Sequence, residues 1–140
     1  MASVLRIFRA PKRRLPMEEL NEAALVKDFG LKGCAHARRG SKRQVLLVDR
    51  ETLEAMELQP GIIRENITTE GLNVNGLAVG QKLKVGEIKL AVSTVCTPCD
   101  QLGKIRQGLR RELWGRRGML CVVLEGGIIR RGDPIEKLLD

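Results

Sequence analysis

The sequence predicts a β-rich α+β fold with many short strands and few helices. Two observations lead to this fold class. The apolar runs are short and separated by turn residues, and 15 of the 140 residues are glycine, a pattern that favours strands and turns over a helical bundle. At this length, with 43% hydrophobic and 30% charged residues, we expect one globular domain over residues 1–140.

The first half of the chain is expected to hold strands around one short helix. Three segments are predicted as strands, at residues 3–10, 44–48 and 62–67, and the last is followed by a polar loop at 68–71. Asp49 is predicted to cap a helix that ends near Met56. The segment 17–29 fits two structures, because its apolar spacing suits a helix that stops at Gly30 and yet it can also pair as a strand.

The second half is expected to alternate strands with one helix. Strands are predicted at residues 83–85 and 87–95, which flank Gly86, and at 119–124 and 128–130, which are expected to form a hairpin. Between these two pairs, a helix after Cys99 would present one apolar face, made by Leu102, Ile105, Leu109 and Leu113. Gly108 weakens this helix and permits a break or a bend there.

The stretch that joins the strand at 87–95 to this helix carries the candidate reactive atom. Thr97 is a good helix N-cap, Pro98 suits the first helical position, and Cys99 then lies in the first turn. Free backbone N–H groups and the helix dipole at that place favour a thiolate, the nucleophilic form of a cysteine. We therefore expect Cys99 to be the working thiol.

The four cysteines leave several kinds of chemistry open. The sequence Cys96-Thr97-Pro98-Cys99, after a strand and before a helix, fits a thiol–disulfide active site. The same pair could bind zinc with Cys34 and His36 as further ligands. A third interpretation is a single reactive thiolate at Cys99 that ligates a soft metal or carries sulfur as a persulfide. The non-functional alternative is burial as small apolar side chains, which we expect for Cys121.

Charge and composition restrict the partners. The net charge of +8 predicts an anionic partner. Nucleic acid is not expected to be that partner, because three aromatic residues are few for a surface that stacks on bases. No hydrophobic stretch approaches the ~20 residues of a membrane span, and residues 1–6 lack the apolar region of a signal peptide. With its four cysteines interpreted as thiols, the protein is expected to be cytoplasmic and to bind no membrane.

Short motifs along residues 3–135 occur in the order found in one known family. They are Gly33-Cys34-Ala35-His36-Ala37, Arg43-Gln44-Val45, Arg64-Glu65-Asn66-Ile67 followed by Gly71-Leu72, Val79-Gly80, Val85-Gly86-Glu87, Thr97-Pro98-Cys99 with Leu102, and Gly132-Asp133. On this ordered set the chain resembles MOSC domains, which are named for the C-terminal domain of molybdenum-cofactor sulfurase. Its length is similar to that of the short standalone bacterial members.

The resemblance implies a β-barrel with a few short helices and one longer helix after Cys99, and it implies that residues 17–29 are mainly strand. It also implies that Cys99 is the sulfur acceptor, as a persulfide, or a molybdenum ligand. The motifs that match the family's cleft supply the candidate cofactor-binding residues, which are His36, Arg43, Arg64, Asn66 and Thr97. One position departs from the family pattern, since Cys34 stands where the family often has aspartate.

Without the resemblance, the same residues have plainer interpretations. Arg64 fits an arginine on a surface strand, His36 fits a loop histidine bonded to backbone groups, and Asn66 fits the closure of the turn after its strand. These alternatives stay open at the level of sequence.

The function that the resemblance implies is a module that binds molybdenum cofactor (molybdopterin), carries sulfur for metal–sulfur chemistry, or does both. Arg64, together with Arg38, Arg39 or Arg43, could hold the cofactor's phosphate. The implied partners are a cysteine desulfurase or another sulfur donor, and molybdoenzymes. No internal pyridoxal phosphate site is expected, because nothing in the chain resembles a desulfurase domain. The alternative is a molybdenum-dependent oxidoreductase subunit that reduces N-oxygenated compounds with partner reductases, so the enzyme class stays open between sulfur transferase and reductase component.

Overall fold

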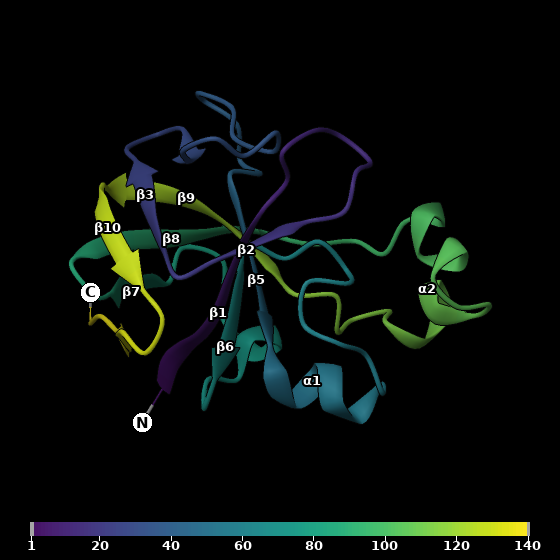
Figure 1. Ribbon diagram of the computed structural model, residues 1–140. Coiled ribbons are helices and arrows are strands. Elements are labelled where there is room, and N and C mark those ends of the chain that lie inside the picture. Colours follow the sequence, from purple (N-terminus) through teal and green to yellow (C-terminus); the bar gives the residue numbers. More distant parts are fainter. Residues whose placement is uncertain (1, 140) are drawn as a thin grey trace.

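The computed structural model describes residues 2–139 and shows a β-barrel with a helical extension on one side (Figure 1). Within this range the strands are β1 Ala2–Arg9, β2 Glu18–Leu20, β3 Glu22–Val26, β4 Gly30–Leu31, β5 Val45–Asp49, β6 Ile67–Glu70, β7 Lys82–Val85, β8 Ile88–Val95, β9 Met119–Glu125, β10 Gly127–Arg130 and β11 Pro134–Lys137. The α-helices are α1 Arg50–Ala55 and α2 Leu109–Glu112, and the 3-10 helices are η1 Val74–Gly76 and η2 Asp100–Lys104.

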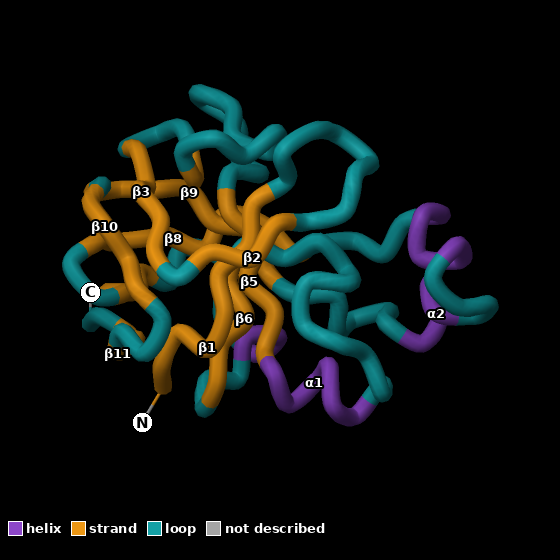
Figure 2. Tube along the Cα trace, in the orientation of Figure 1, coloured by secondary structure: helices purple, strands orange, loops and turns teal. Residues whose placement is uncertain are grey.

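Seven strands close the barrel. Their order is β11-β7-β8-β9-β5-β6-β1, and β1 pairs again with β11, so the sheet has no free edge along this ring. Neighbouring strands are antiparallel except β5 and β6, which run parallel. The strand β2 adds to the outside of this order next to β1, and a second sheet of β10, β3 and β4 lies beside β9 and β8 (Figure 2). The β-rich barrel implied by the family resemblance is confirmed.

The central strand β5 is buried on both faces, as its unbroken apolar run suggests. Val45 and Leu47 point into the main core inside the barrel. Leu46 and Val48 point the other way into a second apolar cluster, which also contains residues of α1 and of the helical extension. This second cluster ties the extension to the wall of the barrel.

Most predicted strands are confirmed, but one is displaced. The segment 17–29 forms β2 and β3, so strand pairing overrides its helical spacing. The strand predicted at 62–67 is wrong, because the chain turns there and β6 begins at Ile67 and runs through the predicted polar loop. The physical reason is that Thr68 and Thr69 are fully buried, between β5 and β1, and the Thr68 hydroxyl donates to the buried Glu65 carboxylate at 2.8 Å.

The predicted hairpin at the end of the chain is wrong, although both of its strands exist. The strand β10 turns away from β9 and pairs antiparallel with β3, so that Ile129 lies opposite Ala23. Both of these side chains are buried in the main core, and this burial favours pairing with β3.

The long helix predicted after Cys99 is also wrong. The segment forms the 3-10 helix η2 and then the four-residue helix α2, and the break falls at Gly108, whose φ of 84° is left-handed. Three of the four predicted apolar side chains, Leu102, Leu109 and Leu113, are buried, whereas Ile105 is exposed. The apolar pattern therefore marked the buried face of two short helical segments rather than one long helix.

Among residues 2–139, none of the helices combines the length and the hydropathy that a membrane span requires.

Candidate functional site

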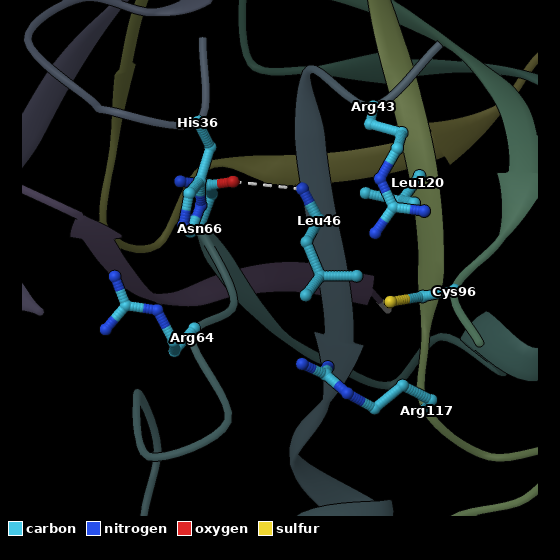
Figure 3. Close-up of a pocket in the computed structure, with 8 residues that line it drawn as sticks. All are labelled: His36, Arg43, Leu46, Arg64, Asn66, Cys96, Arg117 and Leu120. Atoms are coloured by element: carbon cyan, nitrogen blue, oxygen red, sulfur yellow. Dashed lines mark hydrogen bonds between the residues drawn. The ribbon is translucent and has the colours of Figure 1, made fainter. Parts of the chain in front are cut away.

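A pocket of about 160 Å³ opens at the barrel wall where β5, β8, β9 and the loop before β6 meet. Its lining residues are His36, Arg43, Leu46, Arg64, Asn66, Cys96, Arg117 and Leu120. The structure thus gathers four of the sequence-predicted site residues, namely His36, Arg43, Arg64 and Asn66. Figure 3 shows Arg43 and Arg117 approaching Cys96 from two sides, with His36 and Arg64 beyond Leu46. The described residues contribute no acidic side chain to this lining.

Strand pairing explains how residues so distant in sequence meet here. Arg43 lies in the loop just before β5, Leu46 lies in β5, and Leu120 comes from the neighbouring β9. Cys96 directly follows β8, and its backbone N–H donates to the carbonyl oxygen of Gly118 at 3.1 Å, which places Arg117 beside it. The ends of three paired strands therefore bring Arg43 and Arg117 to Cys96, whereas His36 and Arg64 come from loops.

Arg117 is the most deeply buried charge of the pocket, with a relative exposure of 7%. Its Nη2 donates to the carbonyl oxygen of Ile63 at 2.6 Å, whereas its Nε and Nη1 are buried without a hydrogen-bond partner. Buried N–H groups of a guanidinium are costly when unpaired, because they lose water without gaining an acceptor. The unpaired Nε and Nη1 leave this side chain with donors to spare for an anion.

Arg64 is held in an unusual conformation next to the same pocket. Its φ is 68°, in the left-handed region that residues other than glycine rarely adopt, and its Nη1 donates to the carbonyl oxygen of Leu15. Its Nη2 is buried without a partner. Arg64 is therefore a half-buried loop arginine, not the surface strand arginine that is its plainer interpretation.

Asn66 connects three segments of the pocket wall. Its Oδ1 accepts a hydrogen bond from the backbone N–H of Leu46 at 3.0 Å, the contact drawn in Figure 3. Its Nδ2 donates to the carbonyl oxygen of Phe8 and to the Sγ of Cys34, each at 3.3 Å. Asn66 precedes β6, so it does not close a turn after a strand, and it fixes the geometry of the pocket.

Behind this wall, Cys34 is placed to be an anion. Its Sγ accepts hydrogen bonds from Asn66 and from the backbone N–H of Ala10 at 3.3 Å. Burial raises the pKa of this thiol, but hydrogen bonds from His36 and Ala10 and the charge of His36 outweigh burial and lower the pKa from 9.0 to about 7. His36, half-buried in the pocket lining, therefore has the Cys34 thiol as a partner of its side chain.

Cys96, in contrast, is a buried thiol in its neutral form. Burial raises its pKa above 9.0, and the nearby positive charges of Arg117 and Arg43 offset this effect only in part. Cys121 lies in β9, and burial raises its pKa to about 12, which confirms the prediction that it belongs to the core.

Cys99 and Thr97 lie outside the lining of the pocket, and both are exposed. The predicted cap is wrong, because Cys99 itself occupies the N-cap position of η2 and its side chain makes no capping hydrogen bond. The helix η2 has only five residues, so it offers little of the dipole that the sequence argument assumed. Cys99 is nevertheless accessible to solvent. All four cysteines lie within the described range and none forms a disulfide, and of the four only Cys99 is exposed.

The zinc interpretation finds no support in the arrangement of these side chains. Within residues 2–139, no group of three or more histidine, cysteine, aspartate and glutamate side chains is placed to hold a metal ion.

Sequence reasoning missed Arg117 and gave Cys96 no role in the pocket. The signal for both was the antiparallel pairing of β8 with β9, in which Val95 lies opposite Met119. That register carries Cys96 and Arg117 to the same end of the strand pair, but it cannot be read from either strand alone.

A seven-stranded closed barrel with an arginine-rich pocket and a nearby exposed thiol defines the class of this protein. The MOSC domain family model matches residues 35–136, and the chain belongs to this family. The family is associated with molybdenum-cofactor binding and sulfur chemistry.

Solved structures share the fold at low sequence identity. The YuaD protein of Bacillus subtilis superposes with a TM-score of 0.81 at 19% identity, over 96% of this chain and 94% of that one. YiiM of Geobacillus stearothermophilus gives a TM-score of 0.82 at 18% identity, over 99% and 76% of the two chains. YiiM of Escherichia coli gives 0.71 at 21% identity, over 99% and 69%. No curated protein matches the sequence.

Proposed function

We propose that this MOSC protein binds the phosphate-bearing part of molybdenum cofactor in the basic pocket and accepts sulfur on Cys99. The observation that carries the cofactor proposal is Arg117, which lines a cavity with no acidic residue among its described lining and whose Nε and Nη1 are buried without a partner. A phosphate group supplies the acceptors that these N–H groups lack. The residues present therefore fit the group.

The pocket residues would have different roles in binding an anion. The buried Arg117 and the half-buried Arg64 would bind phosphate oxygens, and the exposed Arg43 would neutralise charge at the mouth. Asn66 keeps the wall in place through its three hydrogen bonds. Thr97, exposed near Cys99, would contact the part of the group outside the cavity. When bound, molybdenum cofactor supplies a dithiolene-held metal that takes a thiolate ligand or exchanges sulfur.

Cys99 is the thiol that a sulfur donor can reach. In the proposed step, the Cys99 thiolate attacks the terminal sulfur of a persulfide on the donor. A sulfur–sulfur bond forms on Cys99 as the donor's sulfur–sulfur bond breaks, and the donor leaves as a thiolate that takes up a proton. No net oxidation occurs, because one sulfane sulfur passes from one thiol to another.

The sulfur proposal is tested by mass spectrometry after incubation with a cysteine desulfurase and cysteine. The wild-type chain should gain the mass of one sulfur atom, and Cys99→Ser should not. Cys121→Ser is the matched control, because that buried thiol should not affect the gain. An unmodified wild-type protein, or an adduct that survives in Cys99→Ser, would contradict the assignment.

The anion pocket is tested separately by thermal unfolding with inorganic phosphate. A ligand that binds only the folded state raises the unfolding temperature, and Arg43→Gln should reduce this rise. Arg39→Gln changes the same charge in the same basic loop but lies outside the lining, so it should keep the rise. Equal behaviour of the two variants would refute a role for the pocket.

A further inference from the structure

The connection between β8 and β9 forms a projecting arm, which we define as residues 100–116. It contains η2 and α2 and extends away from the barrel, on the side opposite the C-terminus (Figure 1, Figure 2). Leu102, Leu109 and Leu113 anchor the arm in the second apolar cluster, and the helix α2 otherwise contacts mainly η2. The arm thus has a buried inner face and a free outer face.

The outer face carries a hollow of about 620 Å³, lined by Gln107, Gly108, Arg110, Arg111 and Trp114. Trp114 is 66% exposed, and it is the only tryptophan of the chain. A large apolar ring left in water costs free energy, and tryptophan and arginine are the residues most often found at the energetic centre of protein interfaces. The hollow has the composition of a docking site.

The charge of the arm selects the occupant. The arm has five basic and two acidic residues. Both acidic groups are already paired, Asp100 with Arg110 at 2.7 Å and Glu112 with Arg106 at 2.5 Å. Arg111 makes no ion pair with any described residue, so a partner with carboxylates complements the hollow.

The hollow also lies close to Cys99. Asp100 directly follows Cys99 in the chain, and its carboxylate is bonded to Arg110, which lines the hollow. A molecule seated against Arg110 is therefore separated from the exposed thiol by one ion pair and one residue of the chain.

We propose that this hollow docks an acidic segment, with an apolar side chain against Trp114, of the protein that delivers sulfur to Cys99. The inference rests on the proposed sulfur transfer and names the kind of partner it requires. A second copy of this chain is disfavoured, because it presents the same basic arm and a net charge of +8. A nucleic acid is disfavoured because the hollow offers one ring for stacking, where single-strand binders align several.

Docking leaves the chemical step unchanged and acts on its rate. Cys99 still attacks the terminal sulfur of the donor persulfide, and the donor thiolate leaves. Attraction between the hollow and an acidic donor raises the encounter rate, and salt screens this attraction.

The test compares two synthetic peptides, each ending in a cysteine persulfide. One peptide carries aspartate, glutamate and a leucine before the cysteine, and the other carries serine at those positions. Mass spectrometry follows the sulfur adduct on Cys99. The wild-type chain should react about tenfold faster with the acidic peptide at low salt, and added salt should reduce this preference.

The arm variant Arg111→Glu with Trp114→Ala should lose the preference and still react with the serine peptide. The matched control is Lys137→Glu with Leu139→Ala, which makes the same charge change and removes an exposed apolar side chain at the other end of the molecule. This control should keep the preference. Circular dichroism checks that both variants are folded. If the double variant is not folded, the single variant Arg111→Gln replaces it and should reduce the preference for the acidic peptide.

Two results would overturn docking while leaving the proposed function intact: equal wild-type rates with both peptides, or a preference that survives in the folded arm variant. If the wild type shows no preference between the peptides, and a single-stranded oligonucleotide slows adduct formation in the wild type but not in the arm variant, the arm is a nucleic-acid surface instead. If neither peptide modifies wild-type Cys99, the sulfur-transfer proposal fails, and this inference fails with it.

Discussion

Replacing Cys34 with serine is expected to remove a pH-dependent part of the free energy of unfolding. Serine can still accept the hydrogen bonds from Ala10 and Asn66, but it does not titrate in this range. The comparison of wild type with Cys34→Ser across pH therefore isolates the ionisation of one buried thiol from its packing.

The direction follows from the two pKa values of this thiol. Against the effect of burial, His36 and Ala10 lower the pKa of Cys34 to about 7 in the folded protein, compared with its ordinary value of 9.0 in the unfolded chain. Well below pH 7 both states keep the proton, so ionisation contributes almost nothing. As the pH rises from about 7 to 9 the folded state alone loses the proton, so the unfolding free energy rises, and it levels off above 9.

The magnitude follows from the same values. Two pH units correspond to a limit of about 2.7 kcal/mol above pH 9, and the gain between pH 6 and pH 8 is about 1.3 kcal/mol. Cys96 and Cys121 cannot imitate this effect, because burial raises their pKa values above 9.0 and their contributions fall outside this window.

The assay is urea unfolding followed by circular dichroism at pH 6, 7 and 8 in the presence of a reductant. The wild-type free energy minus that of Cys34→Ser should grow by about 1.3 kcal/mol across this range. Cys121→Ser serves as a control, and its difference from wild type should stay constant. A Cys34→Ser difference that is equally constant, or that shrinks as the pH rises, would refute an ionised Cys34 in the folded state.

Two further substitutions test the framework around the pocket. Asn66→Ala should lower the unfolding free energy by about 3 kcal/mol, because it leaves the backbone N–H of Leu46 and a carbonyl of β1 buried without partners, and denaturant unfolding measures the loss. Gly118→Ala should cost about 3 kcal/mol as well, since its φ is 108° and a Cβ there would lie 2.3 Å from the carbonyl oxygen of Leu47. Gly103→Ala, where a Cβ meets nothing within 4 Å, should leave stability unchanged or raise it by up to about 1 kcal/mol, and any comparable loss there would count against the clash argument.

Local patterns predicted the elements whose causes are local. The strands β1, β5, β7 and β8 follow from apolar runs bounded by turn residues, and α1 follows from Asp49, whose side chain accepts from the Thr52 N–H at 3.2 Å. The ordered motifs also anticipated the barrel. In contrast, the pairing of β10 with β3 and the strand position of Thr68 and Thr69 depend on neighbours far away in the sequence.

In the pocket, too, some residues could be predicted from sequence motifs and others could not. Sequence motifs singled out His36, Arg43, Arg64 and Asn66, and the structure brings these residues together. Arg117 escaped notice because arginine beside glycine before an apolar strand resembles an ordinary surface turn. Its burial appears only when β9 pairs with β8 and the loop of Ile63 covers it.

The sequence by itself determined the family, the β-rich class and the four cysteines from which a working thiol is drawn, since these depend on residue identity and spacing along the chain. Tertiary structure alone decided the state of each thiol. Burial keeps Cys96 and Cys121 neutral, hydrogen bonds from His36 and from the distant Ala10 favour the Cys34 thiolate, and Cys99 lies exposed at the N-cap of η2. The physical reason is that ionisation and access depend on desolvation and on neighbouring donors, which the fold supplies through contacts distant in the sequence.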